Sequence, residues 1–394
     1  LAIPIFMVIM FGIYYLAAGP IGSWTVDMVG TGVEFVSEWM TNFLTNVNAS
    51  PWSTSLVVDG MIAGIGAILN FLPQLIILFL LISILETTGY MARISFFLDR
   101  VFQKVGLSGK SLIPFIIGSG CSVPAIMSAR TINDETEKKM TIMLTPFIPC
   151  SAKLPIITLF AGYFFGDRSG FVSASLYFLA IFIILLSAYV MKNVLFKGKT
   201  SSFILELPEY KLPSLRYVIY DVFSKAWSFI VRAGSVILVA SIIIWFLLSF
   251  DFRMTYGVAV DDSMLAWFGK LISWIFYPML GEMSWAASIS AIQGLVAKEQ
   301  VVGSMAIIAG YTSDVSEARL IFTSGIFGFF TASSAYAFMV FNLFSAPCFG
   351  AIGAMRQELG TTKRMWKAVL FQTGIAWVLA VLVFQVGRLI EVIL

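Results

Sequence analysis

Gly118-Ser-Gly-Cys121-Ser-Val-Pro124 interrupts an apolar stretch of this 394-residue chain, and Pro146-Phe-Ile-Pro-Cys150-Ser-Ala-Lys-Leu-Pro155 interrupts the next one. A third cysteine, Cys348, follows Pro347 in another apolar stretch, and the chain has no further cysteine. Proline and glycine break helices, and a broken helix inside a bilayer is tolerated only where protein buries it or where it lines a cavity. The cysteines are therefore predicted to lie at helix breaks within a membrane protein.

The composition places the chain among polytopic membrane proteins, because 59% of its residues are hydrophobic and only 12% are charged. It contains no histidine, which excludes imidazole metal ligands and histidine-based catalysis. Three cysteines make no disulfide framework, so free buried thiols are expected.

The loops between the apolar stretches differ in charge, which predicts the side of the membrane on which each lies. Residues 19–60 carry four acidic and no basic residues and are predicted to form an external loop, as are the acidic residues 250–283. Residues 87–110, 192–225 and 352–367 are rich in lysine and arginine and are predicted to be cytoplasmic.

Counting the apolar stretches between these loops indicates two that do not cross the membrane. Three stretches lie between the cytoplasmic loops 87–110 and 192–225, so one must enter and leave by the same face, and 111–129 is the best candidate. The same count between the external loop 250–283 and the cytoplasmic loop 352–367 indicates that 284–309 is the second broken or re-entrant element. We expect an all-α membrane protein built from two inverted-topology repeats with broken helices.

The expected domains follow from these repeats. Residues 1–60 are assigned to a first transmembrane helix and an external loop, 61–191 to the first repeat, 192–226 to a cytoplasmic amphipathic linker, and 227–394 to the second repeat with a C-terminal transmembrane helix. Ser214 opens an amphipathic pattern with Leu215, Val218, Ile219, Val222 and Phe223 on one face. This pattern favours a helix on the membrane surface over a plain linker.

Few charged residues fall inside or at the ends of the apolar stretches, where each costs on the order of 3 kcal/mol on insertion scales. They include Glu86, Lys153, Arg232 and the adjacent pair Lys298 and Glu299. For Arg232 and Glu86 a position near the membrane interface, with the charged end reaching water, is the favoured alternative. Glu299 is a candidate cation ligand, and Lys298 could neutralise a carboxylate when the site is empty. The alternative is that Lys298 pairs with an acid only to hold the two repeats together.

The cysteines have the same two interpretations. Free cysteine often packs as a small apolar side chain. At breaks such as the one between Gly120 and Pro124, thiols could instead contact an ion on a transport route. Cysteine with glutamate and no histidine suits a divalent transition ion better than an alkali metal ion.

Several motifs together resemble the membrane domain of the FeoB ferrous-iron transporter family. They cover nearly the whole chain and are Leu85-Glu86-Thr-Thr-Gly89-Tyr90, Gly118-Ser-Gly-Cys121-Ser-Val-Pro124, Thr145-Pro146-Phe-Ile-Pro-Cys150-Ser-Ala-Lys153, Glu206-Leu-Pro-Glu-Tyr210, Val296-Ala-Lys298-Glu299 and Ala346-Pro347-Cys348. The resemblance implies two "Gate" repeats that carry Fe²⁺ across a prokaryotic inner membrane. The predicted ion contacts are Cys121, Cys150, Cys348, Glu299 and Glu86, with Lys298, Lys153, Pro124 and Gly120 in supporting positions.

The resemblance also implies partners. GTP and Mg²⁺ would bind an amino-terminal domain preceding Leu1, so this chain is expected to be the conduit and not an enzyme. Membrane lipid and a small cytoplasmic accessory protein are expected partners, a homo-oligomer is an open alternative, and no nucleic acid is expected. The runner-up function is a gate-repeat carrier for nucleosides or another small solute.

Overall fold

The computed structural model describes residues 5, 8–9, 12–13, 15–17, 19–91, 93–96, 99, 107–195, 210, 213–258, 260–295, 298–309, 318–323 and 325–393. Within these ranges every regular element is a helix, and the β pairing is limited to one isolated bridge between Phe250 and Tyr256. The predicted all-α fold is confirmed. The helix expected in residues 1–18 falls largely outside the described residues.

The contacts divide the chain into two compact units. Unit 1 comprises residues 1–145, 185–242 and 353–359, and unit 2 comprises residues 146–184, 243–352 and 360–394. Both units draw on both halves of the sequence, so they do not follow the boundaries of the two expected repeats.

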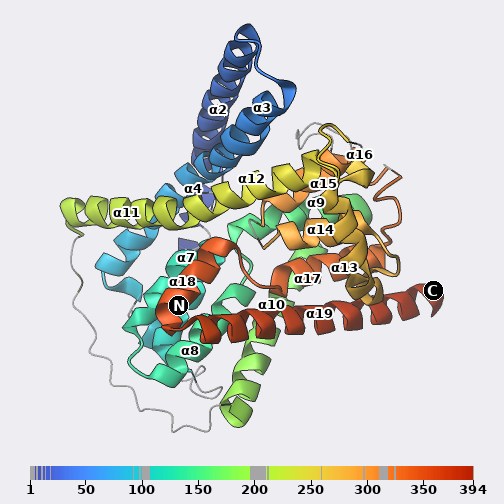
Figure 1. Ribbon diagram of the computed structural model, residues 1–394. Helices are drawn as coiled ribbons and strands as arrows, with labels where there is room; N and C mark the ends of the chain where they lie inside the picture. Colours follow the sequence, from blue (N-terminus) through green and yellow to red (C-terminus); the bar gives the residue numbers. More distant parts are fainter. Residues whose placement is uncertain are drawn as a thin grey trace. The chain divides into compact units, whose positions relative to one another are not determined.

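Unit 1 is organised around a long apolar helix, α4 (Figure 1). Its neighbours α2 and α11 both pack against α4, and α6 packs against α7. The helices of this unit are α2 (Pro20–Asn46), α3 (Pro51–Ser55), α4 (Ala63–Thr87), α6 (Leu112–Gly120), α7 (Ser122–Ser128), α8 (Glu135–Leu144) and α11 (Leu215–Phe229).

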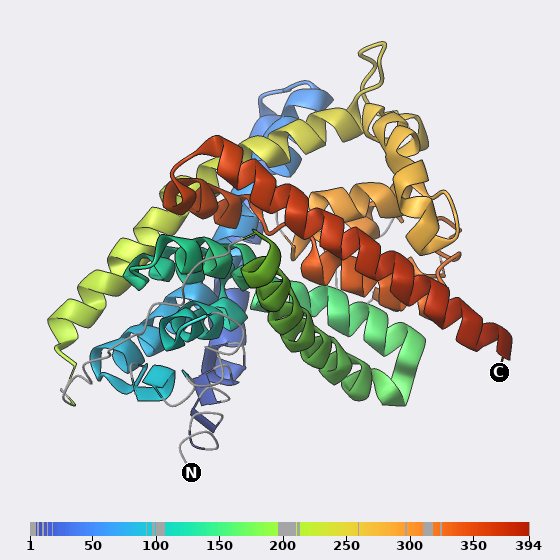
Figure 2. The same cartoon turned by 90° about the horizontal axis from the view of Figure 1, so that it is seen from below.

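Unit 2 contains the C-terminal helix α19, along which α17 packs (Figure 2). Phe160 of α9 lies at the centre of an aromatic cluster, with ring centroids 4.9 to 5.2 Å from Phe322, Phe330 and Phe338. The helices of this unit are α9 (Leu154–Phe165), α13 (Met264–Leu280), α14 (Trp285–Gln293), α15 (Gln300–Ile308), α16 (Ala318–Ile321), α17 (Ala332–Phe344) and α19 (Thr362–Ile393). Helices α10 (Ser169–Val190), α12 (Ser235–Ser249) and α18 (Phe349–Leu359) run from one unit into the other.

Four helical stretches among the described residues are long and apolar enough to cross a membrane: Pro51–Thr87, Glu135–Asn193, Ala332–Leu359 and Thr362–Glu391. About 20 apolar residues are needed to span the hydrocarbon core. The chain is accordingly a multi-pass membrane protein, as its composition predicts.

Both segments predicted to be broken helices contain a break in the structure. Residues 111–129 form α6 and α7 with an extended residue, Cys121, between them, and residues 284–309 form α14 and α15 on either side of a break that includes Lys298 and Glu299. The first break has a simple cause. Pro124 lacks the N–H that would bond to the carbonyl of Gly120, so the helix cannot continue past that residue.

Two segments that the charge pattern predicts as external loops contain long helices instead. Residues 20–46, within the loop predicted at 19–60, form the 27-residue helix α2, and residues 264–280 form the 17-residue helix α13. Pro20 suits the first turn of α2, and the Ser263 side chain accepts a hydrogen bond from the Ala266 N–H at the start of α13. The charge count indicated sidedness but carried no information on these helix starts.

The amphipathic helix predicted after Ser214 is present as α11, and the Ser214 side chain accepts a hydrogen bond from the Tyr217 N–H. Two of the five residues of the predicted apolar face, Val218 and Val222, are buried, whereas Leu215, Ile219 and Phe223 are exposed. Two sides of α11 are therefore apolar, one packed on α4 and one available to lipid.

Gly120 allows α6 to lie close to Leu78 of α4, and replacing this glycine tests the packing. A Cβ at Gly120 would collide with the side chain of Leu78 on α4, whereas a Cβ at Gly162 in α9 would meet no atom within 4 Å. Gly120→Ala should therefore destabilise the protein by about 1–3 kcal/mol through overpacking. Gly162→Ala should be neutral or stabilising, by up to about 1 kcal/mol. Thermal unfolding of the detergent-solubilised variants measures both, and equal melting temperatures would contradict this packing.

Candidate functional site

Cys121 occupies the break in unit 1. Its backbone is extended, with φ −149° and ψ 129°, so it ends α6 and precedes the first residue of α7. The side chain is 7% exposed. Pro124 lies in the first turn of α7, where a missing N–H costs nothing, and Gly120 brings the end of α6 against Leu78. The two supporting residues thus shape the backbone on either side of the thiol.

Cys150 occupies a second break, in unit 2, between the end of α8 and the start of α9. Its backbone is extended, with φ −98° and ψ 166°, and its side chain is 8% exposed. Pro146 and Pro149 prevent a continuous helix here, and Pro155 falls in the first turn of α9.

Lys153 is 2% exposed and ties this break to a second one. Its Nζ donates to the backbone carbonyl oxygens of Pro146 at 2.7 Å, Ile148 at 3.3 Å and Leu343 at 2.7 Å. An ammonium has three N–H donors, so all of them are used. These bonds offset the cost of burying the charge, which is large for an unpaired ammonium.

The third break follows α17 and has a similar origin. Pro347 lacks the N–H that would bond to the carbonyl of Leu343, four residues earlier, and this is the carbonyl that Lys153 contacts. Cys348 directly follows Pro347 at the start of α18 and is partly exposed. Lys153 thereby joins the break that contains Cys150 to the break that contains Cys348.

Lys298 and Glu299 lie in the break between α14 and α15 of the same unit. Lys298 is 1% exposed, and its Nζ donates to the hydroxyl oxygen of Ser345 at 2.6 Å. It also interacts electrostatically with Lys153, Cys150 and Cys348, and Cys348 interacts with Glu299. Glu299 is partly exposed. The alternative considered for Lys298, a pairing with an acid, is absent from the ion pairs of the described residues.

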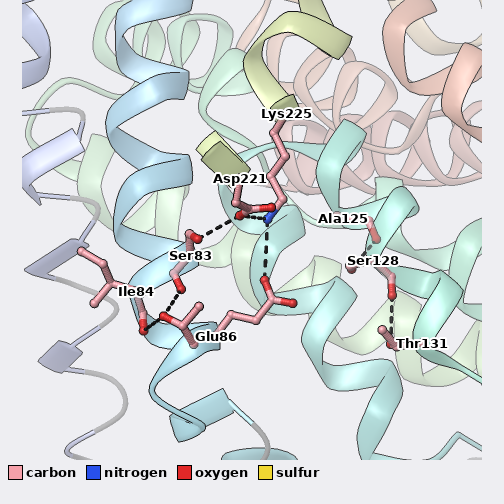
Figure 3. Close-up of polar contacts among 9 residues, drawn as sticks. Ser83, Ile84, Glu86, Ala125, Ser128, Thr131, Asp221 and Lys225 are labelled. Carbon is pink, nitrogen blue, oxygen red and sulfur yellow. Dashed lines mark hydrogen bonds and ion pairs between the residues drawn. The ribbon is translucent and has the colours of Figure 1, made fainter. Parts of the chain in front are cut away.

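Glu86 lies in unit 1, at the end of α4, with its side chain 50% exposed. Its carboxylate is 3.6 Å from the Nζ of Lys225 on α11, which also pairs with Asp221 at 2.6 Å (Figure 3). Asp221 in turn accepts a hydrogen bond from Ser83 at 2.8 Å. In this structure Glu86 belongs to a polar network that fastens α11 to α4.

The structure brings together five of the predicted residues in unit 2, namely Cys150, Lys153, Lys298, Glu299 and Cys348. Within the described residues no three cysteine, aspartate or glutamate side chains gather closely enough to hold a metal ion. The cluster therefore combines two thiols and a carboxyl group with two buried lysine side chains.

Sequence reasoning missed two partners of the lysines, the carbonyl of Leu343 and the hydroxyl of Ser345. Pro347 was a usable signal for the first, because a proline leaves the carbonyl four residues before it without a helical donor. Nothing in the sequence around Ser345 indicates that it would accept from a lysine 47 positions away.

Two known families match this chain. The Gate family, described as nucleoside recognition, matches residues 68–164 and 230–362. A second family, described as the C terminus of ferrous iron transport protein B, matches residues 174–225. The two Gate segments together make up more than half of the chain and contain Cys121, Cys150, Glu299 and Cys348.

Three relatives illustrate the similarity. A protein named Fe(2+) transporter FeoB from Staphylococcus aureus (strain MSSA476) is 39% identical over 394 residues, covering 99% of this chain and 58% of the relative. One of the same name from Methanocaldococcus jannaschii is 38% identical, covering 90% of this chain and 53% of the relative. A Porphyromonas gingivalis protein named as a fusion of Fe(2+) transport protein A with Fe(2+) transporter FeoB is 33% identical, covering 99% and 50%.

No solved structure matches the chain. The chain spans a little over half the length of the curated relatives it matches, 50% to 58% in these three. Because the Gate matches cover most of it and the similarity to the relatives runs along nearly all of it, this chain belongs to the Gate family and corresponds to the membrane part of the ferrous iron transport protein B proteins.

Proposed function

We propose that this chain conducts Fe²⁺ across the prokaryotic inner membrane as the permease part of a GTP-regulated iron uptake protein. The observation that carries the proposal is the cluster of Cys150, Cys348 and Glu299 around two buried lysines at the helix breaks of unit 2. The names of the relatives supply the ion, Fe²⁺.

The residue types suit this ion. Thiolates favour soft and borderline metals and carboxylates favour harder ones, so a mixed set fits a divalent transition ion. No site of three such ligands is assembled among the described residues, which is consistent with a route along which the ion is handed on rather than stored. Cys150, Cys348 and Glu299 would act in unit 2 and Cys121 in unit 1.

Lys153 and Lys298 have different roles in this proposal. Lys153 has all three donors occupied by carbonyl oxygens, so it acts as a fixed internal cation that holds the breaks in place. Lys298 bonds only to Ser345 among the described residues, and it can swing away when an ion approaches the thiols.

Glu86 stays a prediction as an ion contact. Its carboxylate would have to release Lys225 before it could bind a cation. An exposed ion pair of this kind is typically worth about 0–1 kcal/mol, so the release is energetically accessible.

The remaining parts of the proposal concern the whole protein. GTP and Mg²⁺ would bind an amino-terminal domain, and this chain would carry no catalytic residues. A small cytoplasmic accessory protein is a proposed partner, supported by the fused relative named above. The domains proposed for the chain are those at 1–60, 61–191, 192–226 and 227–394, and the matches to the Gate family fall within the second and fourth.

A nucleoside carrier is the second candidate, because the Gate family is described as nucleoside recognition. The relatives that match nearly the whole chain are named as ferrous iron transporters, which favours iron. Ferrous iron uptake that is insensitive to excess nucleoside is the result expected here.

Replacing the thiols tests the route. Cys150→Ser and Cys348→Ser should each reduce ferrous iron uptake about tenfold or more, because a hydroxyl is a poor substitute for a thiolate on a borderline metal. Cys121→Ser should do the same if the ion passes unit 1 as proposed. Uptake of radioactive ferrous iron into cells, normalised to the amount of protein in the membrane, measures the effect. Thr158→Ser on α9 is the matched control, and normal uptake by all three cysteine variants would remove the thiols from the mechanism.

The carboxylate can be tested in the same assay. Glu299→Gln should lower uptake about tenfold or more, because an amide lacks the negative charge that attracts a divalent ion. Glu282→Gln, at an exposed glutamate after α13, should leave uptake unchanged. Equal uptake by the two variants would show that Glu299 is not an ion contact.

A further inference from the structure

Among the described residues of unit 2, two of the buried side-chain oxygens that lack a hydrogen-bond partner lie near the break between α14 and α15. They are the Oε1 of Gln293, the last residue of α14, and the Oδ1 of Asn342 in α17. Asn342 is 2% exposed, and its Nδ2 donates to the carbonyl of Phe338 at 3.0 Å. That bond fixes the orientation of the amide and leaves its oxygen without a donor.

A buried acceptor without a donor is costly, and native proteins pair the great majority of such groups. Each exception therefore needs a physical explanation. In a protein whose cargo is a cation, an acceptor that meets no donor is available as a ligand. Amide and carbonyl oxygens are suitable neutral ligands for divalent cations.

The position of the Asn342 oxygen supports this explanation. A Cβ added at Gly294 would lie 3.1 Å from Oδ1 of Asn342 and 3.1 Å from the carbonyl oxygen of Ala291. Two oxygens from two helices, together with Cγ2 of Val301 at 3.1 Å, thus surround the small and tightly bounded space beside Gly294. Gly294 has φ −57° and ψ −16°, which any residue can adopt, so its backbone does not require glycine.

This space lies at the start of the break that leads to Lys298 and Glu299. Asn342 also lies one residue before Leu343, whose carbonyl Lys153 contacts, and three before Ser345, which Lys298 contacts. The unpaired oxygen therefore lies on α17, the helix that carries the carbonyl contacted by Lys153 and ends beside the hydroxyl contacted by Lys298.

We propose that the carboxamide oxygen of Asn342, beside Gly294, is an oxygen ligand for the divalent ion as it passes the break between α14 and α15. This inference rests on the proposed function and adds a neutral, hard ligand to the thiols and the carboxylate. The role of the oxygen is to replace part of the hydration shell that the ion loses on leaving water.

Asn342→Leu distinguishes a ligand role of the amide from a purely structural one. Leucine is similar in shape to asparagine, and it removes the unpaired acceptor. The variant should melt at the same temperature as the unaltered protein or higher. It should nevertheless raise the KM for ferrous iron about tenfold or more, on the scale of losing one interaction at a metal site. Asn342→Asp, which keeps an oxygen in place, should retain a KM closer to that of the unaltered protein. Both are measured with the full-length protein reconstituted in lipid vesicles.

Asn70→Leu is the matched control. The Oδ1 of Asn70 is also buried and unpartnered, but it lies within the continuous helix α4 of unit 1. Its replacement should leave the KM unchanged. If Asn342→Leu did not assemble, Gly294→Ala would be measured instead, because its methyl group would press on the Asn342 oxygen and should raise the KM as well.

An unchanged KM in Asn342→Leu, or in Gly294→Ala where that variant is used, overturns the inference. If Cys150→Ser abolishes ferrous iron uptake while Asn342→Leu keeps the KM of the unaltered protein, only the inference about Asn342 fails. If the unaltered protein takes up no ferrous iron, the proposed function fails and the inference fails with it.

Discussion

The ammonium of Lys153 on three backbone carbonyl oxygens is the contact on which the site in unit 2 depends. Prolines create the need for it, because Pro347 leaves the carbonyl of Leu343 without its helical donor, and prolines 146 and 149 prevent a helix around Cys150. In a membrane such groups cannot turn to water. One buried lysine satisfies acceptors from two breaks at once, and the cysteines beside those breaks are held near each other as a consequence.

A second buried lysine makes the region electrostatically unusual. Lys298 lies near Lys153 and near both thiols, yet hydrogen-bonds only to Ser345 among the described residues. When both lysines are protonated their charges repel each other, and the nearby sulfur and carboxyl groups can offset that repulsion when they are ionised. A divalent cation would compete for the same groups. In the proposed function, the position of Lys298 would depend on the presence of the ion, which a purely structural ion pair would not require.

Much of the fold could be predicted from the sequence, because its signals are local. Composition predicts a membrane protein, and the prolines and glycines near Cys121 and Cys150 predict the breaks there. The helices α2 and α13 were predicted as loops, because loop charge reports sidedness and not backbone conformation. The residue types of the site could be predicted, but the hydrogen-bond partners of its two lysines could not. Whether Lys153 meets Leu343 or Lys298 meets Ser345 depends on packing between segments far apart in the chain. The unpaired oxygen of Asn342 is likewise visible only in three dimensions.

In the proposed function, thiols of this chain touch the transported ion. X-ray absorption at the iron edge of the full-length protein loaded anaerobically with Fe²⁺ tests this contact. We expect a sulfur shell at roughly 2.3 Å, the length found for zinc–thiolate bonds, that disappears when Cys150 and Cys348 are replaced by serine. A coordination shell of oxygen and nitrogen alone in the unaltered protein would contradict it.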